Sequence, residues 1–281
     1  MGSVFSPYYA AARRRGLADP EQFCALNVAL YGDVPRWAMT ERGRADITRS
    51  PERFSIGPSC VSWDGDVLQI DINERCMPIP SKLEGRLRVH TPAPIDHAVT
   101  LNPQGAHVWR PFAPTARVSL ELGEPRLSWQ GQGYFDSNHG AAPLESGFSH
   151  WHWSRMAQGA DTLVIYDATR ADGSPCAFAR HFSDQGEIAD AALPPPGSLP
   201  RGLWGVARPT RADAGSTPRL IRRLEDAPFY TRSEIAASIG GQECHGVHES
   251  LDLSRFSQRW VQTLLPFRMP RIAKRRATRN L

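Results

Sequence analysis

Alternation of apolar and polar side chains recurs along almost the whole chain. In the segment 67–74 (VLQIDINE), the apolar residues Leu68, Ile70 and Ile72 alternate with the polar residues Gln69, Asp71 and Asn73, which is the pattern of a β-strand with one buried face. Such segments follow one another every ten to twenty residues, with many of the 23 glycines and 24 prolines between them. The others are 24–32, 36–44, 82–90, 116–123, 126–136, 148–156, 161–169 and 175–182. The pattern favours a mainly β chain folded as a sandwich or barrel.

Few segments favour a helix. Residues 254–267 (SRFSQRWVQTLLPF) are the best helix candidate, and residues 220–238 fit either a strand or a short helix. Residues 1–22 are expected to form an irregular lead-in. Three consecutive prolines at 194–196 predict a stiff surface connection. No window approaches eighteen apolar residues, so we expect no transmembrane helix.

The strand segments suggest two β domains, residues 1–140 and 141–265, followed by a basic tail of residues 266–281. The tail holds six basic residues and no acidic one, and subtracting six from the chain's 33 leaves 27 against 29 acidic residues. The six are Arg268, Arg271, Lys274, Arg275, Arg276 and Arg279. Such a tail suits an anionic membrane surface, at about 1 kcal/mol per basic residue, or it is simply a solvated end. The body has no basic patch, which argues against nucleic acid as a partner.

The cysteines and common motifs exclude several classes of site. The five cysteines are scattered without a CxxC pair, which argues for free thiols in a reducing compartment. Cys244, His245 and His248 lack a second group of ligands at a recognisable spacing, so a polar loop is preferred to a metal site. GxGxxG after a strand, GxxxxGK[ST], HExxH and GxSxG are all absent. These absences set aside several cofactor chemistries, and we expect no metal site.

The stretch from His107 to Trp153 carries the residues most suited to chemistry. His107 and Trp109 are two residues apart, as are Tyr134 and Asp136, so in extended strands each pair leaves from one face. Five of the eight tryptophans lie between residues 100 and 210. An aromatic-walled cavity that holds one acid would suit the chemistry of an unreactive hydrocarbon.

Asp136 is the candidate acid. It ends a predicted strand whose same-face residues are polar, and in a confined site desolvation would raise its pKa and keep it protonated near neutrality. A neutral carboxyl group is a general acid, and indole rings can stabilise a cation. A solvated strand edge is the alternative for Tyr134 and Asp136. Ordinary core alternation is the alternative for His107 and Trp109, and His150 and His152 are interpreted as polar-face residues.

Several motifs closely resemble those of the carotenoid 1,2-hydratase (hydroxyneurosporene synthase) family. In the first half these are MGSVFSPYYAAARRRG, CALNVALYG followed by RWAMTERG, IGPSCVSWDGD, IDINE and IPSKLEGRLRVH. GAHVWRP, GYFDSNHG, HWHWSR and the terminal LLPFRMPR extend the likeness over nearly the whole chain. The resemblance implies two lipocalin-like β-barrel or sandwich domains of the AttH/hydratase type. It also implies a cofactor-free lyase of carotenoid biosynthesis in phototrophic bacteria.

The resemblance places the proposed acid and its helpers in the HxW and YxD motifs. Asp136 would protonate C2 of the terminal double bond of neurosporene or lycopene, and water would add to the tertiary cation at C1. Tyr134 and His107 would position the acid or the water, and Trp109 would stabilise the cation. The expected substrate-binding residues are Trp151, Trp153 and Trp129.

The resemblance implies a cytoplasmic bacterial enzyme that associates peripherally with the membrane, with the basic tail as the candidate contact. Two other functions fit the same scaffold. One is a lipocalin-like carrier of isoprenoids that performs no chemistry. The other is a polyene cyclase or Diels–Alder-type enzyme, whose product would be an isomer without added oxygen.

Overall fold

The computed structural model describes residues 1–17, 19–91 and 94–272, and most of them lie in β-strands. The chain divides into two units, each of which contains segments that are distant in sequence. The first unit takes residues 1–91, 117–132 and the chain from 262, and the second takes 92–116 and 133–261. This division differs from the one expected near residue 140, because 92–116 and 117–132 join sheets of different units. In the described ranges, no helix has the length and apolar character to cross a membrane.

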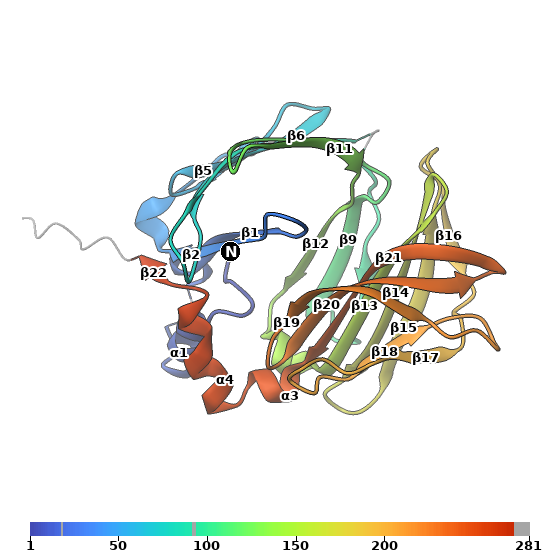
Figure 1. The fold of residues 1–281 in the computed structure, drawn as a ribbon. Helices are drawn as coiled ribbons and strands as arrows, with labels where there is room; N and C mark the ends of the chain where they lie inside the picture. Colours follow the sequence, from blue (N-terminus) through green and yellow to red (C-terminus); the bar gives the residue numbers. More distant parts are fainter. Residues whose placement is uncertain (18, 92–93, 273–281) are drawn as a thin grey trace, which may run out of the picture. The chain divides into compact units, whose positions relative to one another are not determined.

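The first unit is built on a seven-stranded antiparallel sheet in the order β11-β10-β7-β6-β5-β4-β3, and a smaller sheet in the order β1-β2-β22. Figure 1 shows the larger sheet arching over the β1–β2 hairpin. Its elements are α1 (Pro7–Arg14), η1 (Pro20–Gln22), β1 (Cys24–Leu30), β2 (Arg36–Arg42), η2 (Arg44–Asp46), β3 (Ile47–Arg49), β4 (Arg53–Ile56), β5 (Ser59–Trp63), β6 (Val67–Arg75), β7 (Lys82–His90), β10 (Arg117–Glu124), β11 (Leu127–Gln132), η3 (Leu265–Phe267) and β22 (Arg271–Ile272).

The core of this unit lies between the arch and the hairpin. Ala38 of β2 packs with Ile72, Leu83 and Leu120 of the arched sheet. These side chains occupy the apolar positions of the alternating segments, and a sheet with one apolar face must cover it.

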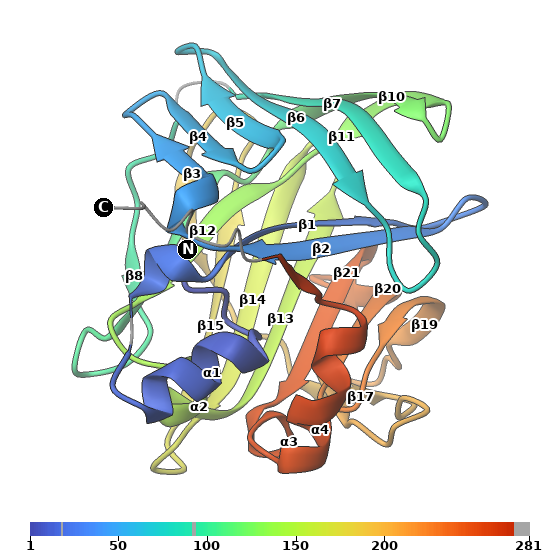
Figure 2. The ribbon, with the colours of Figure 1, turned by 90° about the vertical axis from the view of Figure 1, so that its left-hand side faces the viewer.

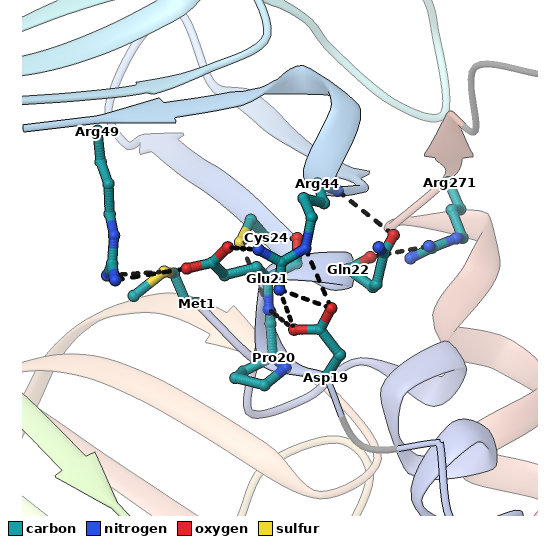
Figure 3. Close-up of polar contacts among 9 residues, drawn as sticks. All are labelled: Met1, Asp19, Pro20, Glu21, Gln22, Cys24, Arg44, Arg49 and Arg271. Atoms are coloured by element: carbon teal, nitrogen blue, oxygen red, sulfur yellow. Dashed lines mark hydrogen bonds and ion pairs between the residues drawn. The ribbon is translucent and has the colours of Figure 1, made fainter. Parts of the chain in front are cut away.

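The lead-in contains a helix, so the prediction of an irregular segment is wrong for residues 7–14. Ser6 caps α1 by accepting a hydrogen bond from the amide of Tyr9 at 2.9 Å, and Pro7 takes the first helical position. The residues after α1 are bound to η2, which follows β2. Figure 3 shows the Arg44 side chain between Asp19 and Glu21, with which it forms ion pairs.

The start of the predicted tail belongs to the first unit. β22 pairs in parallel with β2, and Arg271 forms an ion pair with the buried Glu41. The Arg268 guanidinium lies 4.0 Å from the ring centroid of Trp37, whose indole N–H donates to the Arg268 carbonyl at 3.0 Å. Residues 266–272 are therefore held in the fold. Lys274, Arg275, Arg276 and Arg279 lie outside the described residues.

The second unit contains a seven-stranded antiparallel sheet in the order β16-β15-β14-β13-β21-β20-β19, together with the sheets β12-β9-β8 and β17-β18. Its long central strands run side by side in Figure 2. Its elements are β8 (Val99–Thr100), β9 (His107–Ala113), β12 (Phe135–Gly140), α2 (Leu144–Gly147), β13 (Phe148–Gln158), β14 (Asp161–Arg170), β15 (Pro175–Phe182), β16 (Ile188–Ala191), β17 (Pro196–Leu199), β18 (Arg208–Arg211), β19 (Arg219–Asp226), β20 (Tyr230–Ile239), β21 (Gln242–Asp252) and α3 (Leu253–Phe256), with α4 (Arg259–Leu264) at the division.

Two segments break where one element was expected. The predicted strand 126–136 ends as β11 at Gln132 and resumes as β12 at Phe135, in different sheets. The predicted helix 254–267 is interrupted between Phe256 and Arg259, and α3 and α4 are both short. In contrast, residues 220–238 resolve into two paired strands, β19 and β20. The period of a sequence indicates strand or helix, but it does not reveal where a chain changes sheets.

Candidate active site

The candidate acid lies on β12, paired with β9. In this antiparallel register Asp136 is opposite Pro111, with an irregularity between Phe135 and Asp136. Trp109 is two residues before Pro111 and therefore leaves β9 from the same face. Trp109 is fully buried, with 0% of its surface exposed. Asp136 and Trp109 thus meet because two strands pair, although 27 residues separate them.

The Asp136 carboxyl group is held by two donors on one oxygen. The Trp109 indole N–H and the Tyr134 hydroxyl each donate to Oδ2 at 2.8 Å. Tyr134 lies just before β12 begins, and its hydroxyl oxygen is also 3.3 Å from the Trp109 nitrogen. The three side chains form a closed triangle of polar atoms. Because both hydrogen bonds go to Oδ2, Oδ1 is the oxygen that can carry a proton.

Burial sets the protonation of this group. Burial raises the pKa of Asp136, while the hydrogen bonds from Tyr134 and Trp109 oppose the rise and the charge of Glu249 adds to it. Burial, together with the charge of Asp136, raises the pKa of Tyr134 well above its ordinary value. The arrangement therefore favours a neutral phenol beside a carboxyl group that holds its proton to a higher pH than usual.

Aromatic rings of the large sheet pack against Trp109 and Tyr134 of this triangle. The ring centroids of Tyr166 on β14 and Trp109 are 4.9 Å apart, and those of Trp153 on β13 and Tyr134 are 5.3 Å apart. Trp151 meets Tyr166 edge-on at 5.4 Å. Trp151 and Trp153 therefore share a face of β13, as predicted from their spacing, and they line the same cluster as Asp136.

Arg155 follows Trp153 on that face and adds a half-buried cation. Its guanidinium carbon lies 5.8 Å from the centroid of the Tyr134 ring, and one nitrogen donates to the Gly133 carbonyl at 3.2 Å. Burial lowers the pKa of Arg155. Its Nε and the indole nitrogen of Trp153 are both buried without a hydrogen-bond partner in the described part of the chain. Two donors in this cluster are thus free to bind a polar ligand.

His107 lies at the other end of β9. It is opposite Gly140 in the register, four residues along each strand from the Pro111–Asp136 pair, a distance of roughly 13 Å. Its ring contacts Phe148 edge-on at 5.3 Å and fits between Gly140 and Gly147, where a Cβ would lie within 3 Å of the imidazole. Burial lowers its pKa. The structure does not bring His107 to the carboxyl group.

Trp129 also falls outside the cluster. It lies on β11 of the first unit and is exposed. The predicted site is therefore assembled in part: the second unit brings together Asp136, Tyr134, Trp109 and Trp153, with Trp151 beside them. No three His, Cys, Asp or Glu side chains converge as metal ligands in residues 1–17, 19–91 and 94–272.

Comparison with known proteins identifies the family. The model of the family described as carotenoid hydratase CrtC matches residues 1–278. The chain belongs to this family. An acyclic carotenoid 1,2-hydratase of Thiocapsa roseopersicina is 48% identical over 274 residues, which cover 97% of this chain and 68% of that protein. One of Cereibacter sphaeroides is 42% identical over 273 residues, covering 96% of both proteins.

Membership of the carotenoid hydratase family confirms the resemblance seen in the motifs and the prediction of a hydro-lyase. The fold prediction is also confirmed. A crystal structure of a candidate AttH protein from Nitrosomonas europaea superimposes with a TM-score of 0.52 at 10% identity, covering 78% of this chain and 77% of that one. This likeness concerns the mainly β, lipocalin-like architecture alone.

The sequence pattern of this carotenoid hydratase did not predict several residues of the cluster. Tyr166 packs on Trp109 and donates to Asn138 at 3.3 Å, Arg155 lies by Tyr134, and Glu249 acts on Asp136 through its charge. The spacing from Trp153 to Arg155 was a usable signal, since residues two apart share a face. Tyr166 and Glu249 had none, because only the pairing of β13 with β14 and β21 places them opposite Trp153.

Proposed function

We propose that this enzyme adds water across the terminal C1–C2 double bond of acyclic carotenoids such as neurosporene and lycopene. The observation that supports this most directly is the Asp136 carboxyl group, which is bonded at one oxygen and enclosed by aromatic rings. The names of the relatives supply the substrate class. Hydration of an alkene is redox-neutral, so its balance requires only a proton donor, a water molecule and a site for the cation.

Asp136 is the proton donor. With Trp109 and Tyr134 both donating to Oδ2, Oδ2 behaves as the carbonyl oxygen and Oδ1 carries the proton. Transfer of that proton to C2 forms a C–H bond and leaves a tertiary carbocation at C1. Water attacks C1 and gives its surplus proton to the Asp136 carboxylate. The alcohol forms and the acid is restored, which closes the cycle.

The cation and the water have different candidate partners. Other aromatic rings pack around Trp109, so its role is to orient the carboxyl group. Trp153 is the better-placed ring for the cation, and such an attraction is worth about 2 kcal/mol when desolvated. The unpartnered N–H groups of Trp153 and Arg155 are suited to hold the oxygen of the attacking water. His107, at the other end of β9, takes no part in proton transfer.

The decisive experiment follows the oxygen and the hydrogen that the substrate gains from water. Purified protein is incubated with lycopene or neurosporene in detergent, in H₂¹⁸O or in D₂O. We expect a 1-hydroxy product that contains ¹⁸O and, in D₂O, one deuterium at C2. Recovery of unchanged carotenoid bound to the protein would favour the carrier, and an isomeric product without oxygen would favour the cyclase.

A membrane surface is the proposed partner because the substrate dissolves in lipid. The predicted role of the tail can be tested only beyond Ile272, since removal from Pro266 would also delete Arg271, the partner of buried Glu41. A chain ending at Ile272 should keep its thermal unfolding midpoint and bind anionic vesicles more weakly, by about fivefold for each basic residue that contacts lipid. Unchanged binding would remove the tail as a contact.

A further inference from the structure

An exposed apolar surface lies on the second unit, on the loop 200–207 and the segment 253–260. Leu203 is 81% exposed, and the indoles of Trp204 and Trp260 are 46% and 43% exposed. The two indole rings stack on each other, with centroids 6.1 Å apart and planes at 28°. Large apolar side chains gathered on a surface mark a site of interaction. We call these three side chains the tryptophan surface.

The loop that carries this surface is firmly held. Arg255 donates to the Trp204 carbonyl at 2.7 Å, and the Leu203 amide donates to Asp226 at 2.7 Å. Gly202 lies so close that a Cβ there would be 2.6 Å from the Asp226 carboxylate. The backbone is thus fixed by polar contacts that leave the apolar side chains pointing outward. Their exposure is a built feature of the fold.

The two segments that carry the tryptophan surface contain only basic charges, and the adjacent carboxylates of Asp226 and Asp252 are paired with Arg208 and Arg255. Residues 200–207 and 253–260 contain three arginines and no acidic residue. Arg201 and Arg259 are exposed and Arg255 is half-buried. An isologous contact with a second copy would place these arginines against each other. Stacked indoles, an exposed leucine and arginines match the interface of an anionic lipid bilayer, where indoles prefer the headgroup level.

We propose that the tryptophan surface docks the enzyme on an anionic bilayer, with Leu203 entering the acyl region and the two indoles at the headgroup level. This inference rests on the proposed function, since a substrate dissolved in lipid must be collected there. α3 packs against β13, the strand that carries Trp153. Docking through this surface therefore holds the unit that contains Asp136 at the membrane.

The test measures binding to vesicles of equimolar phosphatidylglycerol and phosphatidylcholine. The double variant Trp204→Ala/Trp260→Ala and the variant Leu203→Ser should each bind at least about tenfold more weakly. The double variant Arg201→Gln/Arg259→Gln should lose most of the salt dependence. Bromine-labelled acyl chains should quench less fluorescence in the tryptophan variant. The matched control is Ile79→Ser, which removes a side chain that is 80% exposed on the first unit and should bind like the parent.

Two further measurements separate the possible outcomes. With carotenoid in detergent the tryptophan variant should turn over at the parent's rate, whereas with carotenoid in vesicles its rate should fall. Unchanged vesicle binding overturns the proposal, and a change from dimer to monomer with unchanged binding assigns the surface to a second copy. If the parent adds no water in detergent, the proposed function fails, while vesicle binding still decides the docking.

Discussion

Two titratable groups lie against opposite faces of the large sheet of the second unit. Asp136, half-buried on β12, is bonded to Tyr134, whose ring contacts Trp153 of β13. The buried His248 is bonded to Ser154, the next residue of β13. Burial raises the pKa of Asp136 and lowers the pKa of His248 to about 3. One physical cause therefore disfavours the charged form of both groups. It shifts the acid toward its protonated form and the base toward its neutral form.

Hydrogen bonding separates the two groups further. The nitrogens of His248 are both engaged, by the Ser154 hydroxyl at 2.8 Å and the Ser250 hydroxyl at 3.0 Å. In contrast, Trp109 and Tyr134 both donate to a single oxygen of Asp136, Oδ2. Burial alone thus does not make a catalytic acid. The group must also be an acid rather than a base, and it must have an oxygen that can carry the proton.

The largest expected effect is the fall in turnover rate caused by the substitution Asp136→Asn. The amide oxygen of Asn can still accept from Trp109 and Tyr134, but the side chain has no acidic proton, so the rate should fall about 10³-fold. Carotenoid binding, followed by absorption, should change little. The matched control is Asp167→Asn, which removes a carboxylate paired with Arg211 at 2.8 Å and should keep activity. More than a few per cent of activity in Asp136→Asn would place the acid elsewhere.

Tyr134→Phe should lower the rate roughly tenfold to a hundredfold, because the carboxyl group loses an orienting donor. The Tyr134 hydrogen bond lowers the pKa of Asp136, so its loss raises that pKa. Activity needs the protonated acid and is lost as pH rises through its pKa, so this loss should move to higher pH. Tyr166→Phe removes a hydroxyl that is bonded to Asn138 instead, so its loss of activity should occur at the same pH as in the parent. An unchanged pH for this loss in Tyr134→Phe would contradict the assignment of Asp136 as the acid.

The lowered pKa values of the buried histidines should appear in the pH dependence of the unfolding free energy. The pKa of His248 is lowered to about 3 and that of His152 to about 4, against roughly 6.5 in the unfolded chain. Their contribution is full above about pH 6.5 and is lost on acidification toward pH 4, at up to about 3 kcal/mol per pH unit for the pair. In His248→Gln the slope of the unfolding free energy against pH should be shallower by about 1.4 kcal/mol per unit.

The acid should show the opposite sign in the same measurement. Because its folded pKa is raised, Asp136 stabilises the fold below its unfolded pKa and loses this contribution as pH rises through its folded pKa. In the parent, this contribution makes the free energy of unfolding decrease as pH rises. Asp136→Asn should abolish that decrease. Equal slopes in the parent and both variants would contradict the comparison.

The smallest effect is expected from Glu249→Gln. The charge of Glu249 contributes to the raised pKa of Asp136 but is its smallest cause. Removing it should move the alkaline loss of activity to lower pH, by less than the opposite shift expected in Tyr134→Phe. A pH profile of turnover would show the shift, with Glu243→Gln as the control for a carboxylate on the same strand. A shift larger than that of Tyr134→Phe would reverse the order of causes.

Local pattern predicted much of the fold. The segments 82–90 and 175–182 coincide with β7 and β15, because a half-buried strand requires alternation at each residue. The helix α1 was missed although Ser6 and Pro7 are ordinary signals of a helix start. The pattern predicts one element in each of the segments 126–136 and 254–267, but each is interrupted. The interruptions reflect the sheet or unit that a segment joins, which no short window contains.

The sequence by itself determined the strand period, the shared face of Trp151 and Trp153, and the motifs by which the family was recognised. Tertiary structure alone decided that Asp136 meets Trp109 while His107 lies roughly 13 Å away, and that Tyr166, Arg155 and Glu249 join the cluster. The reason is physical: side-chain direction follows from local backbone geometry, whereas strand register and burial follow from pairing between distant segments. A carboxyl group's pKa depends on that burial, so the chemistry of Asp136 is a property of the folded chain.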